Sequence, residues 1–341
     1  MTFGIWGILN PQVGRLWVLT WEEFQVAHNS ESAIKAALVA NGLIASMKLV
    51  GAVLSGSASM MAEFKHSLGD WANGFFLLIG IRQSQRPSDD RYQFGHGKRV
   101  FFWSFIASLG MLFIGGALSI YGGILKFSHP EPLEHVNLNV GIIALSILFE
   151  CYSFYMATSA ILSEAGEEAR GLRKITRAIP LLAKSTPATR FIFLEDTAAL
   201  LGLVIAGAAI LLAQATGNII FDGAASILIG ILLFFIGFGT AKENASAILG
   251  ESADPSLVKE VGDFVMTIPG VIDIHNVRSM CVGPNSYLIE MVVEADEKTK
   301  LVDCDDIGFC VKRMIKARFK EVPFAHIAVI ADDKERQWGR D

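Results

Sequence analysis

Charged side chains are scarce in this chain of 341 residues. They make up 18% of the residues, and 52% of the residues are hydrophobic, whereas soluble globular proteins carry about 25% charged residues. The formal net charge is only −5, so no basic surface of the kind that binds nucleic acid is predicted. The composition therefore predicts an integral membrane protein and excludes nucleic acid as an expected partner.

Cysteines and catalytic motifs are also few. The four cysteines form no CxxC pair, which argues against a disulfide framework or a cysteine zinc finger. No nucleophile elbow, phosphate-binding loop or HExxH motif occurs, so we do not expect an enzyme. The start of the chain has neither a signal-peptide pattern nor an Arg- and Ser-rich leader, which favours a retained start and a bacterial inner membrane.

Long apolar segments dominate the first two thirds of the chain. A membrane-spanning helix needs about 20 mainly apolar residues, and six segments meet this condition, the second of them interrupted by polar residues. They are Ala36–Leu54, Ala58–Ile81, Val100–Leu125, Val140–Leu162, Phe191–Ala213 and Ile220–Thr240. The sequence predicts a six-helix transmembrane bundle over residues 36–243, preceded by a cytoplasmic segment over residues 1–35.

Basic residues gather in two of the connecting loops. Cytoplasmic loops of membrane proteins carry an excess of Lys and Arg, and the other loops hold almost none. The basic residues of the two loops are Arg82, Arg86, Arg91, Lys98 and Arg99, then Arg170, Arg173, Lys174, Arg177, Lys184 and Arg190. Both termini are therefore predicted to be cytoplasmic, in agreement with an even number of spans.

Residues 244–341 have a different composition and pattern. Helices are predicted over Asp254–Ile268 and Val302–Phe319. Strands are predicted over Val271–Cys281, Tyr287–Ala295 and Ala325–Ile330, with a hairpin turn between the first two. The order α-β-β-α-β predicts a small two-layer α/β domain of ferredoxin-like type in the cytoplasm.

Ionisable residues lie inside the predicted spans, where each costs several kcal/mol unless it is paired or hydrated. The second span holds Glu63, His66 and Asp70, and spacings of three and four residues place all three on one helix face. Imidazole and carboxylate groups are suitable ligands for zinc, iron, cobalt or manganese ions. This face of the second span is therefore a candidate metal site.

Three further acids lie in other spans. Glu195 and Asp196 follow the start of the fifth span, and Glu150 lies near the middle of the fourth. Any one acid could be structural, for example paired with Lys48 of the first span. Asp196 joins His66 and Asp70 as a metal-site candidate, because three uncompensated groups in the membrane would be very costly. Glu63 and Glu195 are less certain ligands, and Glu150 is a candidate proton carrier, ligand or structural partner.

These segments resemble the cation diffusion facilitator family of metal–proton antiporters from about Asn29 to Asp333. The second span reads SGSASMMAEFKHSLGDWANG and contains an HxxxD pair, and the next loop reads RYQFGHGKRVFFW. The sixth span opens FDGAASILIG, and the tail contains VIDIHNVRSMCVGPNSYLIEMVVEAD. EDTAALLG, which begins at Glu195, and the acid Glu150 are similar to the subgroup of the animal zinc transporter nine.

The resemblance implies a homodimer that alternates between inward-open and outward-open states. It implies that His66, Asp70 and Asp196 bind a divalent metal from the cytoplasm. Because metal binds neutral imidazole and ionised carboxylates, its binding displaces protons. Our hypothesis is that His66 and Asp70, with Glu150 as a candidate, exchange metal for protons. Zinc is the first expectation, and iron, cobalt and manganese are alternatives. A membrane metal-binding or regulatory subunit that does not transport is the rival hypothesis.

The sequence departs from the family pattern in two places, and the first of them motivates that rival. Ile192 stands where the fifth helix of the family supplies another ligand, so Glu195, Glu63 or water would have to complete the site. The tail has His275 and His326, but Glu290 and Asp305 stand where further histidines are expected. A full zinc cluster in the cytoplasmic domain is therefore not predicted.

Overall fold

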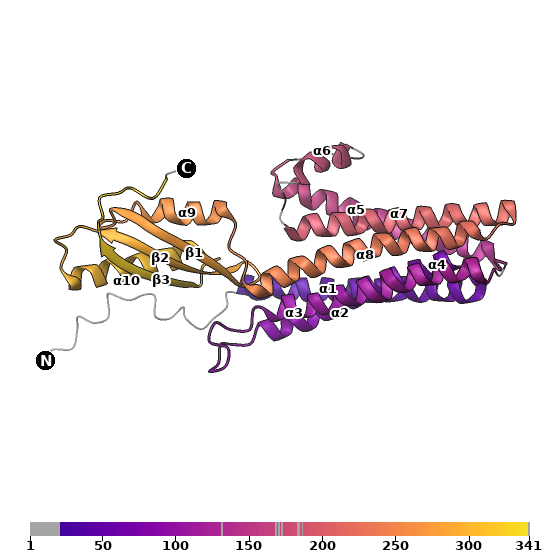
Figure 1. Cartoon of the computed structure of the whole chain (residues 1–341), viewed down its shortest axis with the longest axis horizontal. Helices are drawn as coiled ribbons and strands as arrows, with labels where there is room; N and C mark the ends of the chain where they lie inside the picture. Colours follow the sequence, from indigo (N-terminus) through magenta and orange to yellow (C-terminus); the bar gives the residue numbers. More distant parts are fainter. Residues whose placement is uncertain are drawn as a thin grey trace.

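The computed structural model describes residues 21–339 except 131, 168, 170, 172, 183, 184 and 186. It consists of a long helical bundle with a small sheet domain at one end (Figure 1). The helices of the bundle are α1 (Trp21–Ser55), α2 (Ala58–Ser84), α3 (Arg99–Gly110), α4 (Leu118–Ser128), α5 (Val136–Glu164), α6 (Arg173–Leu181), α7 (Pro187–Thr216) and α8 (Ile220–Leu249). A π-helical segment, Met111–Ala117, joins α3 to α4.

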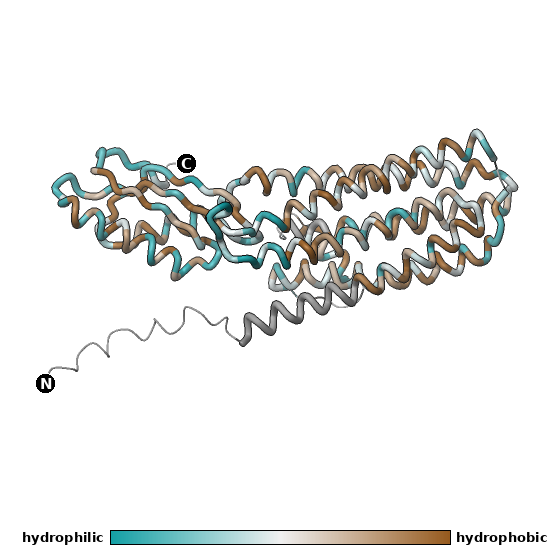
Figure 2. The backbone as a smooth tube through the Cα atoms, turned by 90° about the horizontal axis from the view of Figure 1, so that it is seen from below, coloured by the Kyte–Doolittle hydropathy of each residue, from teal (hydrophilic) through white to brown (hydrophobic). Residues whose placement is uncertain are grey.

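Five of the predicted spans are confirmed as helices long and apolar enough to cross a membrane. They cover Leu38–Ser55, Arg99–Ser128, Val136–Glu164, Ile192–Thr216 and Ile220–Leu249, and apolar residues run along the bundle in Figure 2. The predicted second span, α2, is a helix of 27 residues but is too polar to join this group. Six spans therefore remain a prediction.

The polar helix α2 lies inside the bundle. It contacts α1, α3, α4, α7 and α8, so neighbouring helices surround it. Its polar residues Ser59, Glu63, His66 and Ser67 are all buried among them. Packing inside the bundle explains why α2 can carry charges that a lipid-facing helix could not.

Glycines let α8 approach the helices beside it closely. A Cβ atom on Gly116 would come within 2.9 Å of the Phe234 backbone, and one on Gly237 within 2.8 Å of the Leu112 backbone. Small residues are typical of helix contacts in membranes because they allow the backbones to touch. These contacts hold α8 against the span formed by α3 and α4.

The predicted order of the cytoplasmic domain is confirmed. Its elements are α9 (Pro255–Val265), β1 (Asp273–Gly283), β2 (Ser286–Ala295), α10 (Leu301–Arg318) and β3 (Phe324–Ala331). The strand order is β1-β2-β3, with β1 and β2 antiparallel and β2 and β3 parallel. The predicted hairpin turn is present at Pro284 and Asn285, the latter with φ of 47°.

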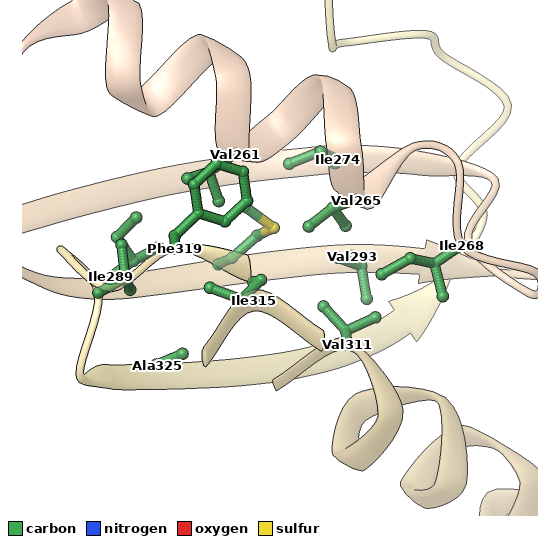
Figure 3. Close-up of a cluster of buried hydrophobic side chains, with 12 residues drawn as sticks. Val261, Val265, Ile268, Ile274, Ile289, Val293, Val311, Ile315, Phe319 and Ala325 are labelled. Atoms are coloured by element: carbon green, nitrogen blue, oxygen red, sulfur yellow. The ribbon is translucent and has the colours of Figure 1, made fainter. Parts of the chain in front are cut away.

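The core of this domain lies between its sheet and its helices (Figure 3). Val261 and Val265 of α9 and Val311 and Ile315 of α10 are fully buried together with Ile289 of β2. The helices therefore cover one face of the sheet with apolar side chains. The predicted domain boundary after residue 243 falls inside α8, which continues to Leu249.

The loop between α2 and α3 touches the sheet domain. The ring of Phe94 packs edge-on against Phe324, with centroids 5.2 Å apart. Lys98 Nζ donates a hydrogen bond of 3.1 Å to the carbonyl of Ile248 at the end of α8. A Cβ on Gly97 would come within 2.6 Å of the Val282 carbonyl. The end of α2 that carries this loop is therefore the end nearer the sheet domain.

The segment after β3 folds back onto the domain through Asp273. The backbone N–H groups of Gln337 and Trp338 donate to its carboxylate, and the Trp338 indole donates to Asp263 at 3.0 Å. Burial alone would raise the pKa of Asp273, but the hydrogen bonds from Gln337, Ile274 and Trp338 outweigh it and hold the pKa below its ordinary value. The ionised carboxylate therefore fixes this segment.

We expect the attachment of residues 332–339 to weaken in acid. A carboxylate with a lowered pKa contributes stability above its unfolded pKa, which is about 3.9 for Asp, and loses that contribution as the pH falls through the folded pKa. The protection factors of these residues, which compare their hydrogen exchange with that of an unfolded chain at the same pH, should be high from pH 5 to 8 and lower at pH 3. In Asp273→Asn the protection factors should be low at every pH. Equal protection of the wild-type segment at pH 6 and pH 3 would contradict this expectation.

Candidate metal site

His66 and Asp70 face each other along α2. The Nε2 atom of His66 lies 3.8 Å from Asp70 Oδ2, and the side chains are 2% and 19% exposed. Neither ring nitrogen of His66, nor Asp70 Oδ1, has a hydrogen-bond partner among the described residues. Buried polar atoms in proteins are nearly always paired with protein, water or an ion. This pair is therefore suited to receive a cation or protons.

Asp196 reaches the same region from α7. It is 9% exposed, and both carboxylate oxygens accept from Ser153 Oγ of α5, at 3.1 and 3.0 Å. A serine hydroxyl holds a carboxylate without neutralising it. The orientation of the Asp196 carboxylate is therefore fixed by α5.

Glu195 lies beside Asp70, where it can hydrogen bond to that carboxyl group. Its Oε1 atom is buried and has no partner among the described residues. Adjacent helix positions differ by about 100° in direction, and α7 contacts both α2 and α5. Glu195 can therefore meet the α2 residue Asp70 while Asp196 meets α5.

Glu150 of α5 belongs to the same electrostatic cluster. Its carboxyl interacts with Asp70, Lys48, His66 and Asp196. Glu195 also interacts with Glu150, so four acids gather with one imidazole and one ammonium group, an arrangement that favours a bound cation in a low-dielectric interior. The sequence prediction named these acids but could not place them together.

Glu63 is paired with Lys48 of α1. The Lys48 ammonium lies 3.0 Å from Glu63 Oε2, and both side chains are fully buried. Lys48 also donates to Ser67 Oγ at 2.8 Å. The alternative in which an acid of α2 pairs with Lys48 is therefore confirmed for Glu63.

Ile192 lies one helical turn before Asp196 on α7 and is 49% exposed. The position where the family pattern has a further ligand is thus apolar and open. Glu195, which faces Asp70, is the nearest carboxyl group of α7 that could compensate. The 3.8 Å between His66 Nε2 and Asp70 Oδ2 is compatible with two atoms that bind one ion at about 2 Å each. Among the residues that the structure describes, the membrane cluster does not bring three ligand atoms within 4.8 Å of one another.

Within the described residues, one group of three possible ligands lies within 4.8 Å, and it is in the sheet domain. His275 Nδ1 lies 3.2 Å from Glu294 Oε1 and 3.7 Å from Asp333 Oδ2. Glu294 is fully buried with Oε2 unpartnered. The sequence prediction named His275 but missed the two acids. Glu290, which the sequence prediction named as standing where a further histidine is expected, is exposed and pairs in register with His326.

Comparison with known proteins matches both parts of the chain. Residues 34–249 match the cation efflux transmembrane domain, and residues 253–328 match the cytoplasmic domain of cation efflux proteins. Together the two matches span nearly all of the predicted membrane and cytoplasmic domains.

Individual relatives carry related names. The mitochondrial proton-coupled zinc antiporter SLC30A9 of Xenopus laevis is 32% identical over 76% of this chain and 46% of its own length. The human protein of the same name is 30% identical over 77% and 45%. Metal tolerance protein C4 of Arabidopsis thaliana is 28% identical over 78% and 57%. The chain thus spans about half the length of these curated relatives.

These relatives bear on the predicted location and class. The animal relatives are named as mitochondrial, so the prediction of a bacterial inner membrane finds no support. The apolar helices and the matched membrane domain confirm a multi-pass integral membrane protein. The matched family comprises transporters and not enzymes, and the chain belongs to this cation efflux family, the cation diffusion facilitators.

Proposed function

We propose that this protein carries a divalent transition-metal ion across the membrane in exchange for protons. His66, Asp70 and Asp196 bind the ion, and Glu195 supplies a further carboxylate where Ile192 offers none. The observation that carries this proposal is the buried His66 imidazole, whose two nitrogens lack partners and which lies 3.8 Å from Asp70. Such a group in a membrane bundle needs a functional reason.

The membrane topology of the proposal has six spans, with α2 as the sixth. α2 is long enough to cross a membrane, and its polar face is sheltered by the helices around it. Residues 36–243 then form the membrane domain, and residues 1–35 and 244–341 lie in the cytoplasm. The sheet domain joins two copies of the chain as a homodimer, as the match to the family's cytoplasmic domain supports.

Competition between metal and protons provides the exchange. A metal ion binds neutral imidazole and ionised carboxylates, so its binding releases protons from His66, Asp70 and their neighbours. Glu150 and Glu195 interact electrostatically with these ligands and take up or pass on the released protons. Metal exported from the cytoplasm is thereby coupled to protons moving inward.

Zinc is the proposed substrate. One imidazole with several carboxylates suits zinc, and two relatives are named as zinc antiporters. An oxygen-rich site that recruits Glu195 would also accept manganese, iron or cobalt, because affinity order alone does not set selectivity.

Transport into vesicles tests the proposal. Purified protein is placed in proteoliposomes that contain a pH-sensitive dye, and zinc, iron, cobalt and manganese are supplied at equal concentrations. We expect zinc to enter while protons leave. Metal entry without proton movement would contradict the exchange. Metal binding without flux of any ion, from folded protein, would favour the non-transporting subunit that the apolar Ile192 suggests.

A further inference from the structure

The Lys48–Glu63 pair is the most deeply buried ion pair among the described residues. Both side chains are fully buried, and the ammonium contacts Glu63 Oε2 at 3.0 Å and Ser67 Oγ at 2.8 Å. Replacing a buried ion pair by apolar residues is often neutral or stabilising. Stability alone therefore does not explain an ammonium group held in the middle of a membrane bundle.

Glu63 lies on the side of the metal site away from the sheet domain. Seven residues separate it from Asp70 on α2, or about 10 Å at 1.5 Å per residue. The Asp70 side leads to the loop that touches the sheet domain through Phe94. An ion that leaves His66 and Asp70 away from the cytoplasm therefore passes the level of Glu63.

The second oxygen of Glu63 lies against α7 without a hydrogen-bond partner among the described residues. This atom, Oε1, is buried. It faces Gly202 of α7, where even a Cβ atom would clash with it. Gly202 follows Asp196 by six residues on the same helix. Helix α7 therefore supplies both the metal-site residue Asp196 and the surface that Glu63 faces. The Oε1 atom thus lies between α2 and α7, the two helices that form the proposed site.

We propose that Glu63 is a second cation-binding station on the exit side of the metal site, and that the Lys48 ammonium occupies it in this state. This inference rests on the proposed function. A metal ion that leaves His66 displaces Lys48 from Glu63, and the ammonium returns once the ion has moved on. Lys48 thus acts as a tethered cation that prevents the metal from being retained at Glu63 or from returning.

Removal of the ammonium tests the station directly. Lys48→Met should let the purified full-length protein bind one further zinc ion per protomer by equilibrium dialysis, and slow zinc uptake at least tenfold. Lys48→Met with Glu63→Gln should return the zinc count to the wild-type value. Lys65→Met is the matched control, because Lys65 of α2 contacts only the Leu118 carbonyl in the described hydrogen bonds, and it should leave both values unchanged.

A second variant guards against misfolding, because an unpaired buried charge is strongly destabilising. Lys48→Arg keeps the ion pair, but a guanidinium binds a carboxylate through two hydrogen bonds and is harder to displace from Glu63. Zinc uptake should therefore slow about fivefold, while the thermal stability should be unchanged. If folded Lys48→Met bound no more zinc per protomer than the wild type, or if Lys48→Arg took up zinc at the wild-type rate, the proposal of a second station at Glu63 would be wrong. Failure of the wild type to bind or move any metal would instead overturn the proposed function.

Discussion

Asp70→Ala should abolish metal uptake while the protein remains folded. We expect a loss of at least about 100-fold, because even the loss of groups that only orient a metal ligand costs 10- to 100-fold. Asp70 faces His66 along α2 at 3.8 Å and contacts Glu195 from α7. Its removal therefore takes away a ligand and the carboxyl group that meets Glu195.

Uptake and proton release in proteoliposomes measure this effect together. Both signals should fall in Asp70→Ala, because the same groups exchange metal for protons. Glu243→Ala is the matched control, since Glu243 is an exposed acid near the end of α8, and it should transport like the wild type.

The folded state of each variant is checked by thermal unfolding in detergent. Asp70 is partly exposed and Asp70 Oδ1 has no partner, so its loss should change the unfolding temperature little. Wild-type zinc uptake by folded Asp70→Ala would remove Asp70 from the site and with it the proposed mechanism. Loss of uptake with a largely lowered unfolding temperature would assign Asp70 a structural role instead.

The sequence predicted the elements of this fold well, because each carries a local pattern. The alternation of β2 and the cap of α9 are local signals, and Asp254 does accept from the N–H of Ser256. Apolar length predicted five spans in the same way. The loop between α2 and α3 was predicted as cytoplasmic, but its contact with Phe324 depends on a sheet domain far along the chain.

The candidate site was predicted in its residues but not in its neighbours. Spacing places Glu63, His66 and Asp70 on one face of α2, yet it does not say which helix that face meets. The partners of Glu63 and Asp196 are Lys48 of α1 and Ser153 of α5, and both depend on how the bundle packs. Glu195 could not be oriented, because the helices on either side of α7 were unknown.

Asp222 is another residue whose packing partners the sequence could not predict, and its substitution has the second large expected effect. The sequence motif FDGAASILIG singled it out only by resemblance, but the structure gives its role. It lies at the start of α8, is fully buried, and accepts from Ser57 Oγ at 2.7 Å and from the Ala58 backbone N–H at 2.7 Å. Ser59 adds its backbone N–H at 3.1 Å and its hydroxyl. One carboxylate thus caps the first turn of α2, where the helix dipole favours negative charge.

Asp222→Ala should lower the free energy of unfolding by about 3 kcal/mol, because hydrogen bonds to a charged group are worth about 1.5–3 kcal/mol and a buried donor left unpaired costs as much again. Ser59→Ala, which removes only one hydroxyl, should cost about 1 kcal/mol. Thermal unfolding in detergent measures both. Since α2 carries His66 and Asp70, Asp222→Ala should also weaken zinc binding, although Asp222 does not belong to the metal cluster. Equal unfolding temperatures for Asp222→Ala and the wild type would show that the start of α2 does not depend on the Asp222 carboxylate.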